Sequence, residues 1–238
     1  MSLLYLMRHG QAGLRHQYDT LSDLGRTQAR LLGEYLAAQK VQFSAVYSGA
    51  LKRQRETAHE ALSAYERAGI AIPEVQVDAN WNEFDLDGVY RAIAPRLADD
   101  DPVFQSEYQK LQRMLEEKDA PAHRTWTHSD TLVVRAWAEG RYEVPGESWQ
   151  AFGERIRGSF ETLGRFSSGE NVAVFSSATP IALWVGRALE LNGRHVLRLA
   201  GATYNAALTT MRLRDGDLAL FSFNGTPHLA EARLRTFR

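Results

Sequence analysis

The chain has 238 residues, of which 44% are hydrophobic, and its 28 basic and 29 acidic side chains give a formal net charge of −1 at pH 7. Without a general excess of positive charge, the composition argues against nucleic acids and membrane surfaces as partners. The absence of cysteine excludes disulfides, zinc–thiolate sites and a cysteine nucleophile. The sequence has no export signal and no apolar run of about 18 residues, so we expect a cytoplasmic protein.

The first part of the chain alternates short apolar runs with patterns of helical period. Strands are predicted at Leu3–Met7, Ala45–Tyr47 and Val75–Val77, and helices at Leu21–Lys40 and Leu51–Ala68. Ser22 is the candidate N-cap of the first helix. This alternation predicts a mostly parallel sheet with helices on both faces.

A different pattern begins after this region. From Asp87 to Arg141 the sequence shows no strand signal, and the run Phe104–Glu117 is helical in its spacing. The acidic triplet that ends at Asp101 favours a helix start over a metal site, because aspartates stabilise the first helical turn. We therefore expect one domain, residues 1–238, with a helical cap inserted at about 87–145.

The alternation resumes near Glu147. An apolar stripe from Trp149 to Phe166 predicts a helix, Val172–Phe175 a buried strand, and Thr179 the cap of a further helix that ends near Leu191. The runs 206–214 and 218–223, on either side of an Asp-Gly pair, predict a β-hairpin. The predicted fold is α/β, a three-layer α/β/α sandwich with a mostly parallel central sheet and a helical insertion.

Candidate reactive residues follow the predicted strands. Arg8 and His9 come directly after the first strand, Arg53 lies in the first helical turn after the second, and Glu83 follows the third. The carboxyl ends of strands are where ligands bind in open α/β sheets. There a neutral imidazole can attack phosphorus, guanidinium groups can hold phosphoryl oxygens, and a carboxylic acid can protonate a leaving alkoxide.

Several segments together resemble the histidine phosphatase superfamily, also called phosphoglycerate mutase-like. The similar segments, in chain order, are Arg8-His9-Gly10-Gln11-Ala12, Tyr18-Asp19-x-Leu21-Ser22-x-x-Gly25-x-x-Gln28-Ala29, Ser48-x-x-Leu51-x-Arg53-x-x-x-Thr57-Ala58, Glu83, and Gly146-Glu147-Ser148 with Phe152 and Arg155. The resemblance covers residues 1–85 and 145 to the end, and the segment between them resembles nothing that we can name.

This resemblance implies a phosphatase that needs no cofactor and no metal. His9 would be the nucleophile, Arg8 and Arg53 would bind the phosphoryl oxygens, and Glu83 would be the proton donor. The expected partner is a small phosphorylated substrate, with no role for nucleic acid or membrane and an oligomeric state that the sequence does not give. The residues expected to bind this substrate are Gln11, His16, Ser177, Ala178 and Thr179.

The sequence departs from the family at one position. Members usually carry a second histidine after the fourth strand, in a Ser-His-Gly context, and here Ser177 stands in its place. A serine hydroxyl donates one hydrogen bond without positive charge, and one lost donor typically costs about 10²–10³ in rate. Backbone N–H groups at the start of the helix near Thr179 can still hold an anion. Among the other histidines, His16, His123 and His128 are candidates to substitute, although a surface position is the stronger expectation for each.

Two other functions are open, and a third motif is interpreted as a turn. A pseudophosphatase would bind anions but have lost turnover, because Ser177 replaces a histidine. A phosphoglycerate mutase is a weaker alternative, because the segment from Gly13 to Leu21 is short and the second histidine is missing. The run Asp85-Leu86-Asp87 is similar to the aspartate nucleophile motif of haloacid dehalogenase-type phosphatases, which require Mg²⁺, but it does not follow a predicted buried strand.

Overall fold

The computed structural model describes residues 2–14, 18–117, 126–163, 169–214 and 217–237. The chain forms two compact units. The first unit consists of Met1–Gly13, Gln17–Glu83 and Ile156–Arg238, and the second of Leu14–His16 and Phe84–Arg155. That the chain is one domain with a cap inserted at about 87–145 stays a prediction, and the second unit contains the segment that it concerns.

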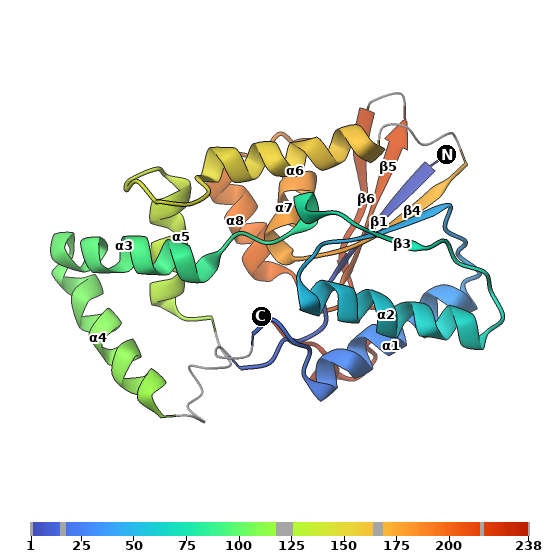
Figure 1. Ribbon diagram of the computed structural model, residues 1–238, viewed down its shortest axis with the longest axis horizontal. Helices are drawn as coiled ribbons and strands as arrows, with labels where there is room; N and C mark the ends of the chain where they lie inside the picture. The colour runs from blue at the N-terminus through green and yellow to red at the C-terminus, as the bar shows by residue number, and fades with distance from the viewer. Residues whose placement is uncertain (1, 15–17, 118–125, 164–168, 215–216, 238) are drawn as a thin grey trace. The chain divides into compact units, whose positions relative to one another are not determined.

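A six-stranded sheet forms the centre of the first unit, with the strand order β3-β2-β4-β1-β5-β6 (Figure 1). The strands are β1 (Ser2–Arg8), β2 (Ala45–Ser48), β3 (Val75–Val77), β4 (Asn171–Ser176), β5 (Leu208–Arg214) and β6 (Asp217–Gly225). The pairs β1–β4, β2–β4 and β2–β3 are parallel, whereas β5 runs antiparallel to both of its neighbours, β1 and β6. The predicted mostly parallel sheet is confirmed.

Three neighbouring parallel strands end at the same edge of this sheet. Arg8, the last residue of β1, pairs with Ser176 at the end of β4, and Ser48 at the end of β2 pairs with Phe175. Each of these strands is then followed by a loop or a helix start. Residues that are far apart in the sequence therefore meet where β1, β2 and β4 end.

The helices α1 (Asp23–Ala38) and α2 (Lys52–Arg67) pack against each other on one face of the sheet (Figure 1). Ser22 is the N-cap of α1, as predicted, and its side chain accepts a hydrogen bond from the Gly25 N–H. A hydrophobic core lies between these helices and the strands. Its larger members are Met7, Leu32, Leu36, Phe43, Val46, Leu62, Tyr65 and Phe175.

The opposite face of the sheet is covered by α7 (Ala178–Ala188), which packs against β1 and β6. Trp184 of α7 stacks on Trp81 of the 3₁₀ helix η2 (Ala79–Trp81), with ring centroids 5.3 Å apart and planes inclined by 19°. α7 is followed by α8 (Gly193–Ala202), and a 3₁₀ turn, η4 (Ala232–Leu234), lies near the end of the chain. Helices on both faces confirm the predicted three-layer arrangement.

The second unit is helical, as the sequence predicted for most of this stretch. It contains α3 (Leu86–Asp100), α4 (Pro102–Glu116), α5 (His128–Ala138) and the first residues of α6 (Trp149–Leu163), whose last residues belong to the first unit. Its core contains packed aromatic rings: the Trp137 centroid lies 4.5 Å from Phe84 and 5.8 Å from Phe152. Asp101 caps α4, as predicted, by accepting hydrogen bonds from two backbone N–H groups of the first turn.

Some local predictions were wrong. Thr179 is not the cap of α7: Ser177 is the N-cap residue, in an extended conformation, and Thr179 already lies inside the helix. The helix ends at Ala188 instead of near Leu191. No prediction covered α8, and the hairpin turn expected at residues 215–216 lies outside the described residues. Among the residues that the structure describes, no helix combines the length and the apolar character needed to cross a membrane.

Candidate active site

The candidate site lies where β1, β4 and β2 end, and the residues that form it belong to the first unit. The His9 N–H donates to the Ser176 carbonyl oxygen at 2.9 Å, and the Gly49 N–H donates to the Phe175 carbonyl oxygen at 3.0 Å. These bonds continue the parallel pairing past the last strand residues. They place the segments that carry His9, Arg53 and Ser177 beside one another.

His9 is buried, and both of its ring nitrogens have partners. Nδ1 lies 2.7 Å from the Gly10 carbonyl oxygen, which can only accept, so Nδ1 carries the proton. Nε2 accepts a hydrogen bond from Arg53 Nε at 3.3 Å. Burial, together with the charges of Arg53 and Arg8, lowers the pKa of His9 well below 6.5, against the opposing effect of the Gly10 carbonyl. The imidazole is therefore neutral at pH 7, with its unprotonated nitrogen facing a cation.

Arg53 is fixed by an acidic partner that the sequence analysis did not single out. Arg53 Nη1 lies 3.0 Å from Asp19 Oδ1, and the guanidinium is also 4.8 Å from the centre of the Tyr18 ring. The Arg53 side chain is 7% exposed and that of Asp19 is 52% exposed. Asp19 also accepts hydrogen bonds from the backbone N–H groups of Lys52, at 3.1 Å, and Arg53, at 3.4 Å.

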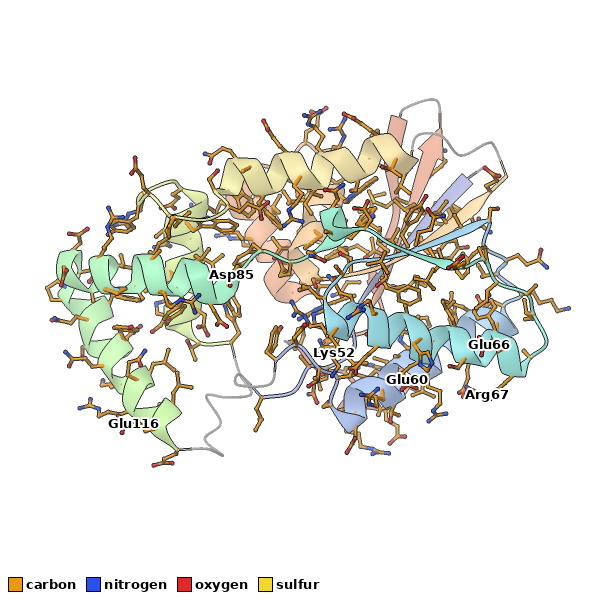
Figure 2. The ribbon with its side chains drawn as sticks, viewed as in Figure 1. Lys52, Glu60, Glu66, Arg67, Asp85 and Glu116 are labelled. Atoms are coloured by element: carbon orange, nitrogen blue, oxygen red, sulfur yellow. The ribbon has the colours of Figure 1, made fainter. Side chains whose placement is uncertain are left out.

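The residue before α2 indicates that this helix needs an acceptor from elsewhere, although it does not identify Asp19. The N-cap position of α2 is occupied by Leu51, whose side chain cannot accept a hydrogen bond. The first N–H groups of α2 therefore need an acceptor from elsewhere in the chain. Figure 2 labels Lys52 at this end of α2 and Arg67 at the other.

Arg8 is also buried at the site. One of its terminal nitrogens donates to the Thr203 carbonyl oxygen, whereas Nε has no hydrogen-bond partner among the described residues. Burial lowers the pKa of Arg8, and the nearby Tyr18 and Glu83 oppose this shift. A buried guanidinium nitrogen without a partner is costly, and an anion bound beside it would remove that cost.

The Glu83 side chain contacts the N-terminal end of α7. Its Oε2 accepts a hydrogen bond from the Thr179 N–H at 3.1 Å, so the carboxylate faces the positive end of the helix dipole. Asn82, the residue before Glu83, is held in place because its Oδ1 accepts a hydrogen bond from the Ala50 N–H at 2.6 Å. The electrostatic influence of Glu83 on Arg8 links the carboxylate to the cationic side of the site.

Ser177 is fully buried, and its Oγ accepts a hydrogen bond from Gln54 Nε2 at 2.9 Å. The sequence analysis missed Gln54, because nothing in its local sequence points to a partner 123 residues away. Ala178 and Thr179 form the first turn of α7. Since the Thr179 N–H is bonded to Glu83, it is not available to an anion in this arrangement.

Two of the expected substrate-binding residues are not joined to this group. The Gln11 Oε1 accepts from Ser22 Oγ at 2.9 Å, and the Gln11 N–H donates to Gln28 at 2.8 Å, both at the α1 side of the loop. His16 lies outside the described residues. The structure therefore brings together Arg8, His9, Arg53, Glu83 and the 177–179 segment, and it does not show Gln11 or His16 with them.

The aspartate motif after Glu83 has a structural role. Asp85 Oδ1 accepts from the Gly88 N–H at 2.9 Å, which makes Asp85 the N-cap of α3 (Figure 2). It follows a 3₁₀ helix instead of the end of a buried strand, which is where an aspartate nucleophile would have to lie. In the described part of the chain, no cluster of three His, Asp or Glu side chains could hold a metal ion.

Comparison with known proteins identifies relatives. The model of the histidine phosphatase superfamily (branch 1) matches residues 4–110 and 106–226. The mitochondrial serine/threonine-protein phosphatase Pgam5 of Caenorhabditis elegans is 30% identical over 113 residues, which are 39% of this chain and 40% of the relative. The chain thus spans less than half the length of this curated relative.

Solved structures share the fold over nearly the whole chain. Bacillus stearothermophilus YhfR has a TM-score of 0.66 and 18% identity, over 96% of this chain and 100% of that chain. A mycobacterial glucosyl-3-phosphoglycerate phosphatase has a TM-score of 0.59 and 22% identity, over 94% of this chain and 99% of that chain. Since the family model extends over most of the sequence and these structures share its fold, the chain belongs to the histidine phosphatase superfamily (branch 1).

Proposed function

We propose that the protein is a phosphomonoester hydrolase that works through a phosphohistidine at His9, without a metal ion, on a small phosphorylated substrate. The observation that carries this proposal is the state of His9: a buried neutral imidazole whose unprotonated Nε2 faces Arg53. Relatives described as phosphatases agree with this class of reaction.

In the first step, His9 Nε2 attacks phosphorus and the bond between phosphorus and the ester oxygen breaks. Arg8 and Arg53 bind the oxygens on which negative charge grows. Glu83, as the carboxylic acid, gives its proton to the leaving alkoxide, which becomes an alcohol.

In the second step, the Glu83 carboxylate takes a proton from water, and the resulting hydroxide attacks phosphorus. The phosphorus–nitrogen bond breaks, inorganic phosphate forms, and His9 returns to its neutral state. In the structure the imidazole already has the protonation state that both the start and the end of this cycle require.

The test compares His9→Ala with the parent on p-nitrophenyl phosphate and a panel of phosphomonoesters, with EDTA present. We expect the His9→Ala variant to lose about 10³-fold or more in kcat/KM, because it lacks the proposed nucleophile. The control is His59→Ala, since His59 is exposed on α2. Equal rates for His9→Ala and the parent would refute the mechanism, and a need for added metal would refute metal independence.

A second candidate function is anion binding with impaired turnover, which the neutral Ser177 favours at a position next to the nucleophile. Calorimetric titration with phosphate distinguishes the two candidates. Tight phosphate binding without hydrolysis of any ester in the panel would support the second candidate. A phosphoglycerate mutase is the weaker alternative, and it would transfer the phosphoryl group between the hydroxyls of a phosphoglycerate instead of releasing phosphate.

A further inference from the structure

Gln54 and Ser177 form a buried pair next to the nucleophile, and the mechanism above assigns Gln54 no role. Gln54 Nε2 donates to Ser177 Oγ at 2.9 Å and to the Trp81 carbonyl oxygen at 3.1 Å. The Gln54 Oε1 accepts from the Leu51 N–H at 3.3 Å. A flipped carboxamide would place Oε1 against the Trp81 carbonyl oxygen, where two acceptors repel each other. The orientation of the Gln54 amide is therefore determined by its neighbours.

The Ser177 hydroxyl is not used by its own helix. Ser177 is the N-cap residue of α7, yet its side chain makes no capping hydrogen bond. By contrast, Ser22 and Thr127 each accept an N–H from the helix that they cap. The lone pair that usually caps a helix is here directed to Gln54, and a hydroxyl that accepts from Gln54 keeps its own hydrogen to donate.

Ser177 is also the neighbour of His9 across the strand ends. β1 and β4 pair up to Arg8 and Ser176, and the His9 N–H continues the ladder to the Ser176 carbonyl. Both His9 and Ser177 are almost completely buried. His9 and Ser177 therefore directly follow the last paired residues of two adjacent strands, and both side chains are buried at these strand ends.

We propose that Gln54 is a positioning residue, which fixes the Ser177 hydroxyl as a neutral donor to a phosphoryl oxygen during transfer to His9. This inference rests on the proposed function and adds Gln54 to it, as a residue that acts through Ser177. An aimed donor stabilises the transition state more than the ground state, since charge grows on the oxygen that it faces. Because neither side chain titrates near neutral pH, this donor does not depend on pH in that range.

The experiment uses the full chain with p-nitrophenyl phosphate for turnover, and orthovanadate and inorganic phosphate for binding. Its variants are Gln54→Met, which keeps the volume without the N–H groups, Ser177→Ala, and the two combined. The matched control is Ser159→Ala, because Ser159 is a fully buried serine of the same unit that accepts from Trp184 Nε1. We expect Ser159→Ala to leave kcat/KM within about twofold of the parent.

We expect Ser177→Ala and Gln54→Met each to lower kcat by about 10–100-fold with a much smaller change in KM. The double variant should be no worse than the more impaired single variant, since both changes remove one donor. Vanadate affinity should fall more than phosphate affinity. The role of Gln54 is overturned if Gln54→Met keeps the kcat and vanadate affinity of the parent while Ser177→Ala loses them, or if the two losses multiply.

Gln54→Glu is the second variant, and it decides the question if Gln54→Met does not fold. A carboxylate at this position would accept the Ser177 hydrogen and turn the donor away from the site, so kcat should fall although the shape is kept. Parent-like kcat in folded Gln54→Glu would overturn the proposal. Failure of the proposed function has a different signature, because His9→Ala would then keep the parent rate. In that case the vanadate affinities of the Gln54 and Ser177 variants would still support or overturn the positioning of Ser177 by Gln54.

Discussion

At His9, burial and the charges of two arginines act in the same direction. Each disfavours the imidazolium ion, and the Gly10 carbonyl opposes them only in part. The same carbonyl selects the tautomer that leaves Nε2 unprotonated. The surroundings of His9 thus keep its imidazole neutral, with Nε2 unprotonated, which is the state that the proposed mechanism requires.

The contribution of Arg53 to the pKa of His9 can be measured. In Arg53→Met the pKa of His9 should rise, because one nearby positive charge is removed, but it should stay below 6.5, because burial is the larger cause. The measurement is an NMR titration of the His9 ring nitrogens. Arg55→Met is the control, since Arg55 is exposed on the same helix two residues away. An equal shift in both variants would contradict this assignment.

The sequence identified the candidate reactive residues and was silent about the residues that orient them. Arg8, His9 and Glu83 became candidates because each follows a predicted strand, and Arg53 became one through the resemblance to a known family. Asp19 and Gln54 could not, because their roles depend on partners brought near by the fold: Asp19 lies 34 positions before Arg53 and Gln54 lies 123 before Ser177. Sequence motifs point to candidate reactive groups, whereas the residues that orient these groups can come from any part of the chain.

At the level of elements, the contact between α1 and α2 depends on a glycine. A Cβ placed on Gly33 of α1 would lie 1.9 Å from the Ala61 carbonyl oxygen of α2. The two helix backbones therefore approach so closely that no side chain fits between them. This approach sets the position of α2, and with it the position of Arg53.

Gly33→Ala should destabilise the protein by about 1–3 kcal/mol, because the backbones must separate to admit the methyl group. The control is Gly158→Ala in α6, where a Cβ meets nothing within 4 Å. There the change should stabilise by about 0.5–1 kcal/mol, through helix propensity alone. Urea unfolding measures both, and a stabilised Gly33→Ala variant would refute the close approach.

The acidic triplet before α4 offers a second test at this level. Asp101→Ala should destabilise the second unit by about 1 kcal/mol, because two N–H groups of the first turn lose their acceptor. Asp99→Ala is its control: Asp99 lies in the last turn of α3, where a carboxylate is unfavourable, so its loss should be neutral or slightly stabilising. The free energy of unfolding distinguishes them, and equal effects would contradict the cap.

Which elements could be predicted also has a physical reason. Strands β1 to β4 were predicted from short apolar runs between helical segments, and the structure confirms them together with helices α1 and α2. The cap of α7 was assigned to Thr179 because a cap before proline is common, yet Ser177 keeps the extended backbone. The strand expected from Ala206 begins at Leu208, since Ala206 has a φ of 54° and bonds the His9 carbonyl through its N–H.

At the scale of the whole molecule, stability at low pH depends on a second histidine, His228, which is partly buried. Burial lowers the pKa of His228 to about 4. Below pH 6.5 the unfolded chain binds a proton at this position that the folded protein does not bind until about pH 4. Stability is therefore complete above pH 6.5 and decreases as the pH falls towards 4.

His228→Phe should make stability less dependent on pH in this window. The parent should lose up to about 1.4 kcal/mol per pH unit through this one group, in addition to a loss of the same sign from His9. Urea unfolding at pH 7 and pH 5 gives the difference for each protein. If the parent and His228→Phe lose the same free energy between these two values, His228 does not carry the effect.

The arrangement of the sheet also explains what the sequence could show of the whole fold. Alternating strands and helices predicted the mostly parallel sheet, while the antiparallel β5 and β6 followed from a hairpin signal. Hydrogen bonds between residues far apart in the sequence could not be predicted. Gln28, for example, accepts from the Gln11 N–H and donates to the Leu234 carbonyl, which joins the segment after His9 to the last turn of the chain.

The stacked indoles of Trp81 and Trp184 give this molecule a natural optical probe. Their transition dipoles are close enough to couple, which should produce a paired band of opposite signs in the ultraviolet circular dichroism of the folded protein. The Trp81 carbonyl accepts from both Gln54 and Ser176, so a displacement of the sheet edge that carries the candidate site also moves one indole of the stacked pair. Ligand occupancy should therefore be readable without a label, as a change in the splitting of that band.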